Sequence, residues 1–316
     1  MTPALPGARA PEGEDRSSRG PSGPVVLALD VGGTKMAAAV VDAGGNIVAN
    51  ACLPTPDSAD PEVVFEALAT AIEAIGSTTS TPAVCGVGCG GPMEAGGEFV
   101  SPLNIHGWRR FPLRRRLAEL VGLPVVVDND AKALALGEGW LGAARGVDNY
   151  VAMVVSTGVG GGIVLDGRLL DGAHGNAGHI GHVVVEPEGR PCTCGGRGCL
   201  EAEASGLSIE ATTGRPAPEA SDAVRHRTGT LVGRAVASVA NLLDVELAVV
   251  AGSVALGFGA VFFDAAQQEI ELRSRLEFSR ATRIVPAGLG ADGPLVGAAA
   301  VGRRSLLASG GGRNPG

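Results

Sequence analysis

Aromatic residues are scarce in this sequence: seven Phe, two Trp and one Tyr make up 3% of its 316 residues. Apolar residues still account for 45%, so the core must be built mainly from Ala, Val and Leu. No apolar run reaches the roughly 18 residues of a membrane-spanning helix, which argues against a membrane protein. Basic residues are also few, and a net charge of −8 argues against nucleic acid as a partner.

Both ends of the chain lack the apolar content of a folded segment. Residues 1–24 are rich in Pro, Gly, Ser and Arg and contain no apolar stretch of the kind found in a signal peptide, so we expect a disordered leader. The Gly-rich tail, residues 309–316, is expected to be flexible. The six cysteines are few, and three of them are grouped like metal ligands, which favours a reducing, cytoplasmic location.

The grouped cysteines, Cys192, Cys194 and Cys199, follow His182 in the sequence. Three thiolates and one imidazole form a closed, tetrahedral zinc site. A disulfide, or a set of reduced structural cysteines, is the alternative. A Cys-x-Cys disulfide closes only with strain, and the nearby His would have no role in it. The sequence therefore predicts structural Zn²⁺, with no open position for a substrate.

Glycine-rich turns follow two apolar strands. A strand at residues 25–29 ends at Asp30-Val-Gly-Gly-Thr-Lys35, and a second strand follows at 36–41. About 125 residues later, a strand at 150–155 ends at Ser156-Thr-Gly-Val-Gly-Gly-Gly162, which we interpret as a turn before a strand at 163–165. Two halves that open alike and continue with alternating helices and strands predict an α/β fold with a cleft between two lobes.

Apolar periodicity and Gly or Pro punctuation predict the remaining elements. Further strands are expected near residues 47–53, 83–89, 124–127, 247–251 and 283–285. Helices are expected near residues 61–75, 113–121, 131–141, 232–243, 262–276 and 294–307.

The two glycine turns have the composition of phosphate-binding loops, because glycines let backbone N–H groups approach an anion. Asp30 can hold Mg²⁺ through water, and the other candidates of the first turn are Gly32, Gly33, Thr34 and Lys35. The second turn offers Ser156, Thr157, Gly158 and Gly160. Neither is a P-loop or a dinucleotide fingerprint, since strands follow both. Either turn alone could be a simple hairpin, but their matching places favour a nucleotide site.

These motifs together resemble the ROK family of sugar kinases and repressors. The resemblance rests on Asp30–Lys35, Asn129-Asp130, Ser156–Gly162 and the pattern Gly-His182…Cys-x-Cys-x4-Cys-x-Glu201, and it runs from about residue 25 to 303. It implies a two-lobed fold like that of actin, Hsp70 and hexokinase (ribonuclease H-like), with duplicated lobes and the active site in the cleft. It also implies a homodimer or a dimer of dimers.

On this resemblance we expect an N-terminal lobe over residues 25–131 and a C-terminal lobe over 132–293, which includes the zinc loop 179–201. A last helix at 294–308 would return to the N-terminal lobe. The resemblance also implies that ATP phosphates lie between the two glycine turns and that the purine lies near Gly252 and Ser253. The sugar would contact Asn104, Asn129, Asp130, His179, His182 and Glu201.

A sugar hydroxyl needs a base to become a nucleophile, and Asp130 is the residue that we expect to serve. The rest of phosphoryl transfer needs positioning and charge neutralisation, from Mg²⁺, backbone N–H groups and Lys35. The alternative for Asp130 is a helix N-cap, and for Glu201 a solvated surface carboxylate. His182 could give one ring nitrogen to zinc and the other to a sugar hydroxyl.

The identity of the sugar depends on His179, where glucokinases of this family usually carry Glu. A Glu accepts two hydroxyl protons, whereas a neutral imidazole offers one acceptor and one donor. N-acetylmannosamine kinases of the family include members with His-Ile-Gly-His. The prediction is ATP-dependent phosphorylation of a hexose at the 6-hydroxyl, with glucose as the first choice and N-acetylmannosamine or another N-acyl amino sugar as the alternative.

Two other classes of function compete with a kinase. A sugar-responsive ROK repressor would need an N-terminal helix-turn-helix, for which the 24 residues before the first strand are too few. A non-catalytic sugar-binding protein would have no need of Asp130 or of two phosphate-binding turns. We therefore expect an enzyme.

Overall fold

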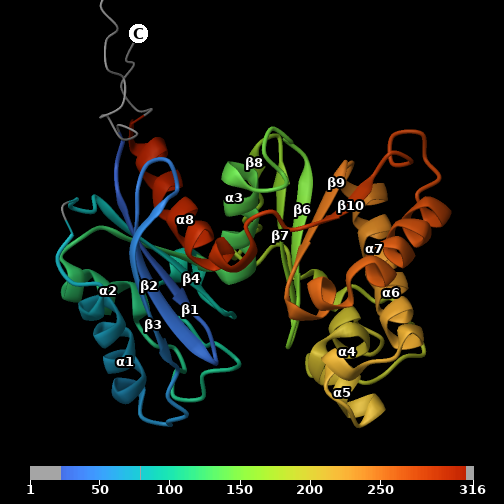
Figure 1. Ribbon diagram of the computed structural model, residues 1–316, viewed down its shortest axis with the longest axis horizontal. Coiled ribbons are helices and arrows are strands. Elements are labelled where there is room, and N and C mark those ends of the chain that lie inside the picture. Colours follow the sequence, from blue (N-terminus) through green and yellow to red (C-terminus); the bar gives the residue numbers. More distant parts are fainter. Residues whose placement is uncertain (1–22, 79, 311–316) are drawn as a thin grey trace, which may run out of the picture.

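The computed structural model describes residues 23–78 and 80–310. Most of the predicted leader and the end of the predicted tail lie outside these ranges. The chain forms two α/β halves side by side, each built on a five-stranded sheet (Figure 1). Within the described ranges, no helix is both long and apolar enough to cross a bilayer.

The first sheet has the strand order β3-β2-β1-β4-β5. Antiparallel pairing joins β1 to β2 and β2 to β3, while β4 and β5 run parallel to β1. Exposed residues alternate along the edge strand β3, whereas the central strands β1 and β4 are apolar and buried except at Asp30. The bounds are β1 Val26–Val31, β2 Lys35–Val41, β3 Ile47–Pro54, β4 Val84–Cys89 and β5 Val125–Asn129.

The second sheet repeats this arrangement with the order β10-β9-β6-β7-β8. Its β6 pairs antiparallel with β7 and parallel with β9, as β1 does with β2 and β4. The bounds are β6 Tyr150–Val155, β7 Val159–Leu165, β8 Arg168–Leu169, β9 Leu247–Ala251 and β10 Arg283–Pro286. This duplication confirms the predicted repeat of strand, glycine turn and strand.

Helices cover both faces of the first sheet. Helices α1 (Pro61–Ala74) and α2 (Leu113–Val121) bury Leu68 and Leu117 against one face. Helix α8 (Gly293–Gly310) covers the other face, so close to β4 that a Cβ on Gly86 would overlap the carbonyl oxygen of Ala298.

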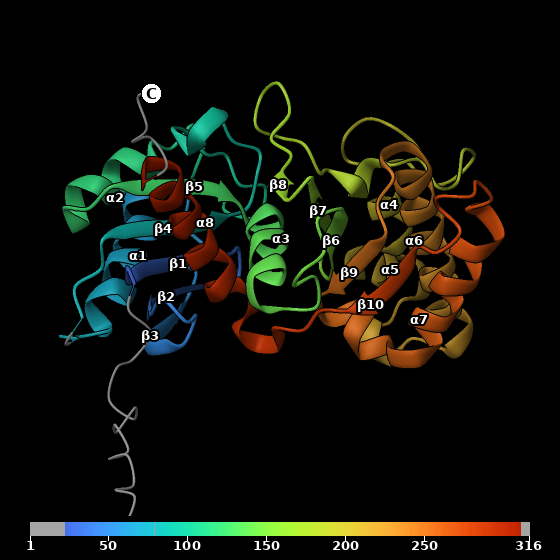
Figure 2. The ribbon, with the colours of Figure 1, turned by 90° about the horizontal axis from the view of Figure 1, so that it is seen from above.

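Helix α3 (Asp130–Leu141) lies between the two sheets (Figure 2). It packs on β7 at glycines, since a Cβ on Gly162 would lie only 2.8 Å from the Cβ of Ala135. Helices α6 (Asp222–Leu243) and α7 (Ser253–Arg273) pack together on the far side of the second sheet. The short helices are α4 (Leu200–Ala204), α5 (Gly206–Thr213) and the 3₁₀ turns Ala95–Gly97, Ile180–His182, Ala217–Glu219 and Gly290–Asp292.

Three predicted boundaries are wrong. One is the start of α6, which lies at Asp222, ten residues before the predicted start. The other two lie at glycines. Strand β7 begins at Val159, so the three glycines that follow it pair with β6 and are not part of the turn. Helix α7 begins at Ser253, nine residues before the predicted start, and is broken at Gly259, where φ is 59° and ψ is −141°. Glycines lack a side chain and so hide the apolar period in both places.

Trp108 belongs to the core of the first half. Its side chain is fully buried and stacks on Phe111, with ring centroids 4.5 Å apart. The indole N–H donates to the carbonyl of Pro61 at 3.2 Å. Cys52 is exposed on the edge strand β3.

Candidate active site

Two carboxylates flank the carboxyl end of β4. Asp30 lies near the end of β1, and Asp130 follows β5, the parallel neighbour on the other side. A Cβ on Gly88 of β4 would lie 4.0 Å from Oδ1 of Asp30 and 3.6 Å from Cα of Asp130. The strand order therefore brings together the predicted Mg²⁺ residue and the predicted base.

Both carboxylates have a raised pKa, and the charge of Asp130 contributes to the rise at Asp30. Burial, and then the negative charge of Asp130, raise the pKa of Asp30 to about 7, against the opposing effect of Lys35. Burial also raises the pKa of Asp130, opposed by backbone N–H groups and by His179. Asp130 is nonetheless exposed to solvent, so water moderates this rise of its pKa.

Asn129 supplies the N-cap of α3. Its side-chain oxygen accepts a hydrogen bond from the N–H of Ala131 at 3.0 Å, and Asp130 is the first residue of the helix. Oδ1 of Asp130 accepts from the same N–H at 2.8 Å. Capping is thus assigned mainly to Asn129, and the other oxygen of Asp130 has no such bond to the helix.

The first glycine turn joins β1 to β2 and is anchored on its outer side by Thr55. The Thr55 hydroxyl donates to the carbonyl of Gly32 at 2.7 Å, and its N–H donates to the carbonyl of Thr34 at 3.0 Å. A Cβ on Gly33 would overlap Asn104, a predicted sugar residue. The turn and Lys35 are exposed, so their donors are accessible to a ligand.

The second glycine turn joins β6 to β7. It comprises Ser156–Gly158, closed by a hydrogen bond from the N–H of Ser156 to the carbonyl of Gly158 at 2.9 Å. Gly160, predicted to bind nucleotide in this turn, lies in β7, where a Cβ would be 3.1 Å from the Cβ of Ala131. Gly160 therefore has a packing role against α3, which corrects its assignment to the turn.

The predicted purine residues lie beside the second turn. The hydroxyls of Ser253 and Ser156 are 2.9 Å apart. Gly252 has φ of 101°, and a Cβ there would overlap the carbonyl of Val155. Only glycine fits here, where the chain leaves β9 beside the end of its parallel neighbour β6, so the second turn and the predicted purine residues lie side by side.

Four predicted ligands form one cluster. Sγ of Cys192 lies 3.7 Å from Nδ1 of His182, and Sγ of Cys194 lies 3.7 Å from Sγ of Cys199. All four ligand atoms lie within 4.8 Å of one another. A disulfide would need about 2.05 Å between sulfurs, whereas tetrahedral zinc with Zn–S bonds of about 2.3 Å sets its sulfurs about 3.7 Å apart. The cluster could therefore hold a metal ion, and its spacing fits zinc.

His179 lies beside this cluster, its ring stacked 6.2 Å from that of His182. Its Nδ1 is 2.8 Å from the carbonyl oxygen of Asn176. A carbonyl can only accept, so Nδ1 carries the hydrogen and Nε2 of the neutral ring is an acceptor. The lowering effect of His179 on the pKa of Asp130 reflects its proximity to that carboxylate.

Glu201 is not a solvated surface carboxylate. Its Oε2 accepts a hydrogen bond from the N–H of Val159 at 3.0 Å. A Cβ on Gly158 would lie 2.9 Å from the same oxygen. Glu201 thus lies against the second glycine turn. It belongs to α4, which begins directly after the last cysteine of the cluster.

Comparison with known proteins decides the family. The family model described as "ROK family" matches residues 26–305. The chain belongs to the ROK family. A relative from Citrobacter koseri named N-acetylmannosamine kinase is 40% identical over 248 residues, which cover 74% of this chain and 84% of the relative.

Two solved structures of the ROK family are similar to this one. A ROK hexokinase from Thermus thermophilus superposes with a TM-score of 0.76 at 34% identity, covering 90% of this chain and 99% of its own. A ROK family glucokinase from Streptomyces griseus, in complex with glucose and AMPPNP, gives a TM-score of 0.76 at 30% identity, covering 89% and 99%. The predicted two-lobed, hexokinase-like fold is thereby confirmed.

This ROK protein also contains buried charges that the sequence analysis missed. Lys132 on α3 is almost fully buried between Asp128 at 2.8 Å and Asp171 at 2.7 Å. Arg304 of α8 also reaches Asp128, at 3.3 Å. The signal was a lysine inside an otherwise apolar helix segment, which requires an ionic partner. The network ties α3 to the loop that leads to His179.

Proposed function

We propose that this ROK protein is an ATP-dependent sugar kinase that phosphorylates an N-acyl amino sugar, N-acetylmannosamine first, at the 6-hydroxyl. The observation that carries the proposal is His179, in a chain whose 40% identical relative is named N-acetylmannosamine kinase. The glucose expectation therefore becomes the second choice. Because Nδ1 of His179 is occupied by the carbonyl of Asn176, Nε2 offers a single acceptor, which suits the N–H of an N-acyl amide, whereas a carboxylate accepts from two hydroxyls.

In this proposal Asp130 accepts the proton of the sugar hydroxyl as the γ-phosphoryl group is transferred. The sugar is held by contacts that orient it, from Asn104, Asn129, His179, His182 and Glu201. The two glycine turns donate N–H groups to the phosphates, and Lys35 adds positive charge. Mg²⁺ bound with ATP would be held near Asp30 and would neutralise phosphate charge.

We also propose that Zn²⁺ occupies the cluster of His182, Cys192, Cys194 and Cys199. Four protein ligands leave no open position, so the ion has a structural role. Because Nδ1 of His182 faces the sulfurs, Nε2 is left for the sugar.

A glucokinase or broader hexokinase is the second candidate. It is favoured by the similarity to the Thermus thermophilus hexokinase and to the Streptomyces griseus glucokinase. The two candidate functions share the fold, the base and the groups that bind the phosphates. They differ in the contact that His179 makes with the sugar.

A sugar panel separates the candidates. With ATP and Mg²⁺, kcat/KM for N-acetylmannosamine is expected to exceed that for glucose, mannose and N-acetylglucosamine by about tenfold or more. His179→Glu should shift the preference toward glucose. A preference for glucose in the wild-type protein would favour the second candidate, and no turnover of any of these sugars would contradict a kinase of this class.

The pH dependence follows from the carboxylate pair. Both carboxylates are needed in the ionised form, so kcat/KM at sub-saturating Mg²⁺ should fall as the pH drops below about 7, the raised pKa of Asp30 in the metal-free protein, and saturating Mg²⁺ should move this fall to lower pH. Stability should change in the opposite direction, because the folded protein binds these protons more tightly: the ligand-free protein should lose stability as the pH rises through about 7. A kcat/KM that stays constant down to about pH 5 would contradict this account.

A further inference from the structure

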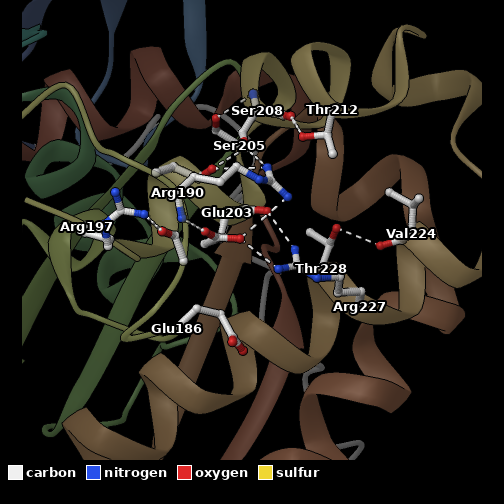
Figure 3. A network of polar contacts seen from close by, with 12 residues as sticks. Glu186, Arg190, Arg197, Glu203, Ser205, Ser208, Thr212, Val224, Arg227 and Thr228 are labelled. Atoms are coloured by element: carbon white, nitrogen blue, oxygen red, sulfur yellow. Dashed lines mark hydrogen bonds and ion pairs between the residues drawn. The ribbon is translucent and has the colours of Figure 1, made fainter.

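A buried carboxylate, Glu203, lies on α4 two residues after Glu201 (Figure 3). Its side chain is only 2% exposed. Oε1 accepts the backbone N–H of Arg190 at 2.6 Å, and Oε2 accepts from the Arg227 guanidinium at 2.7 Å. We call Arg190, Glu203 and Arg227 the clamp. Burial by itself raises the pKa of Glu203, but these donors together lower it, so the carboxylate is charged at neutral pH.

The clamp joins three parts of the second half. Arg190 belongs to the cysteine loop, and its guanidinium donates to the Ser208 hydroxyl of α5 at 2.6 Å. Arg227 extends from α6 and also donates to the backbone carbonyl of Glu203 at 3.2 Å. The loop approaches so closely that a Cβ on Gly189 would overlap Oε1 of Glu203. Figure 3 shows the two arginines on different sides of this carboxylate.

The opposite side of the same segment contacts the candidate active site. Glu201 accepts the N–H of Val159, directly after the second glycine turn. At the start of α5, the N–H of Gly206 donates to the carbonyl of Ser156 at 2.7 Å. Helix α4 has only five residues, too few to fix its own orientation, so side-chain contacts must determine where Glu201 lies.

We propose that Glu203 is a positioning residue: through Arg190 and Arg227 it orients α4, so that Glu201 faces the sugar and α5 supports the second glycine turn. The inference rests on the proposed sugar kinase function. The contribution of Glu203 to the position of α4 is separate from that of the metal. The clamp contacts the cysteine loop at Gly189 and Arg190, before the first cysteine ligand in the sequence. Loss of the clamp therefore loosens the site without removing the ligands.

The competing explanation is that the ion pair is purely structural. A comparison of the Glu203→Gln variant with the Glu138→Gln variant distinguishes this explanation from a positioning role. Glu138 of α3 is also fully buried and accepts backbone N–H groups, from Ala143 at 2.7 Å and Gly288 at 3.0 Å. Both variants should lower Tm. Only Glu203→Gln should raise the KM for the sugar, by about tenfold, with kcat changed less than about threefold and with bound zinc at the wild-type level.

A second variant tests the coupling within the clamp. Arg227→Gln should raise the sugar KM as Glu203→Gln does, and the double variant should add little, because both remove one contact. Hydrogen exchange gives a readout besides activity: amides of Ser156–Gly158 and Val159 should exchange faster in Glu203→Gln than in Glu138→Gln. Hydrogen exchange can be measured even if no sugar is phosphorylated. It therefore tests the positioning role of Glu203 separately from the proposed kinase activity.

Three results would overturn the inference. One is an unchanged sugar KM and unchanged exchange in Glu203→Gln. Another is an equal rise of KM in Glu138→Gln, which would indicate general loosening. Loss of zinc from Glu203→Gln would also contradict it, since the effect would then act through the metal.

Discussion

Asp130→Asn is expected to lower kcat by about 10²–10⁴-fold while sugar affinity stays near that of the wild-type protein. The amide has the same shape but cannot take a proton from the sugar hydroxyl. The N-cap of α3 is supplied by Asn129, so the helix should begin at the same residue. The substitution removes a charge whose burial is unfavourable, so Tm should not fall.

Single-turnover assays and sugar binding without nucleotide measure the two effects separately. Asp128→Asn is a suitable control, because Asp128 is a buried carboxylate two residues earlier that pairs with Lys132. It should reduce stability with a much smaller effect on kcat. Near wild-type turnover by Asp130→Asn would show that another group is the base.

Cys194→Ala is expected to remove the bound metal, to destabilise the protein by about 4 kcal/mol or more, and to weaken sugar binding. The four ligand atoms lie within 4.8 Å of one another, so loss of one opens the coordination and frees the loop that carries His182. Glu201 follows the last ligand by two residues, so its orientation should loosen as well. Elemental analysis, thermal unfolding and the sugar KM measure the three effects.

Cys52→Ala is the matched control, because Cys52 is exposed on the edge strand β3 and lies outside the cluster. It should leave metal content, Tm and sugar KM unchanged. Removal of zinc by a chelator should reproduce the effects of Cys194→Ala. Full activity in protein that contains no zinc would be incompatible with the assignment.

Local patterns predicted much of this fold. The helix expected at residues 113–121 coincides with α2, Leu113–Val121, because its apolar stripe and its glycine stop are both local signals. The cluster of four candidate metal ligands could be predicted equally well, because all four residues lie in one segment of the sequence. The starts of β7 and α7 were missed where glycines interrupt the apolar period and tertiary packing decides the conformation.

The buried charges could not be predicted from local patterns. Glu203 looks like any surface carboxylate of a polar helix end, and its partner Arg227 is 24 residues away on α6. Lys132 pairs with Asp171, 39 residues later, in the loop that follows β8. Only the folded chain brings such partners together, so the clamp and the Lys132 network emerge from the structure alone.

Helix α8 has a consequence for how the chain matures during its synthesis. Strands β1 and β4 emerge early from the ribosome, but the helix that covers one of their faces emerges last. Until then Val26, Ala28 and Val84 lack the cover of Leu295 and Ala298. The second half can therefore form its core before the first half has received α8. A chain that stops before Gly293 leaves that apolar face of the first sheet exposed to water and to other nascent chains.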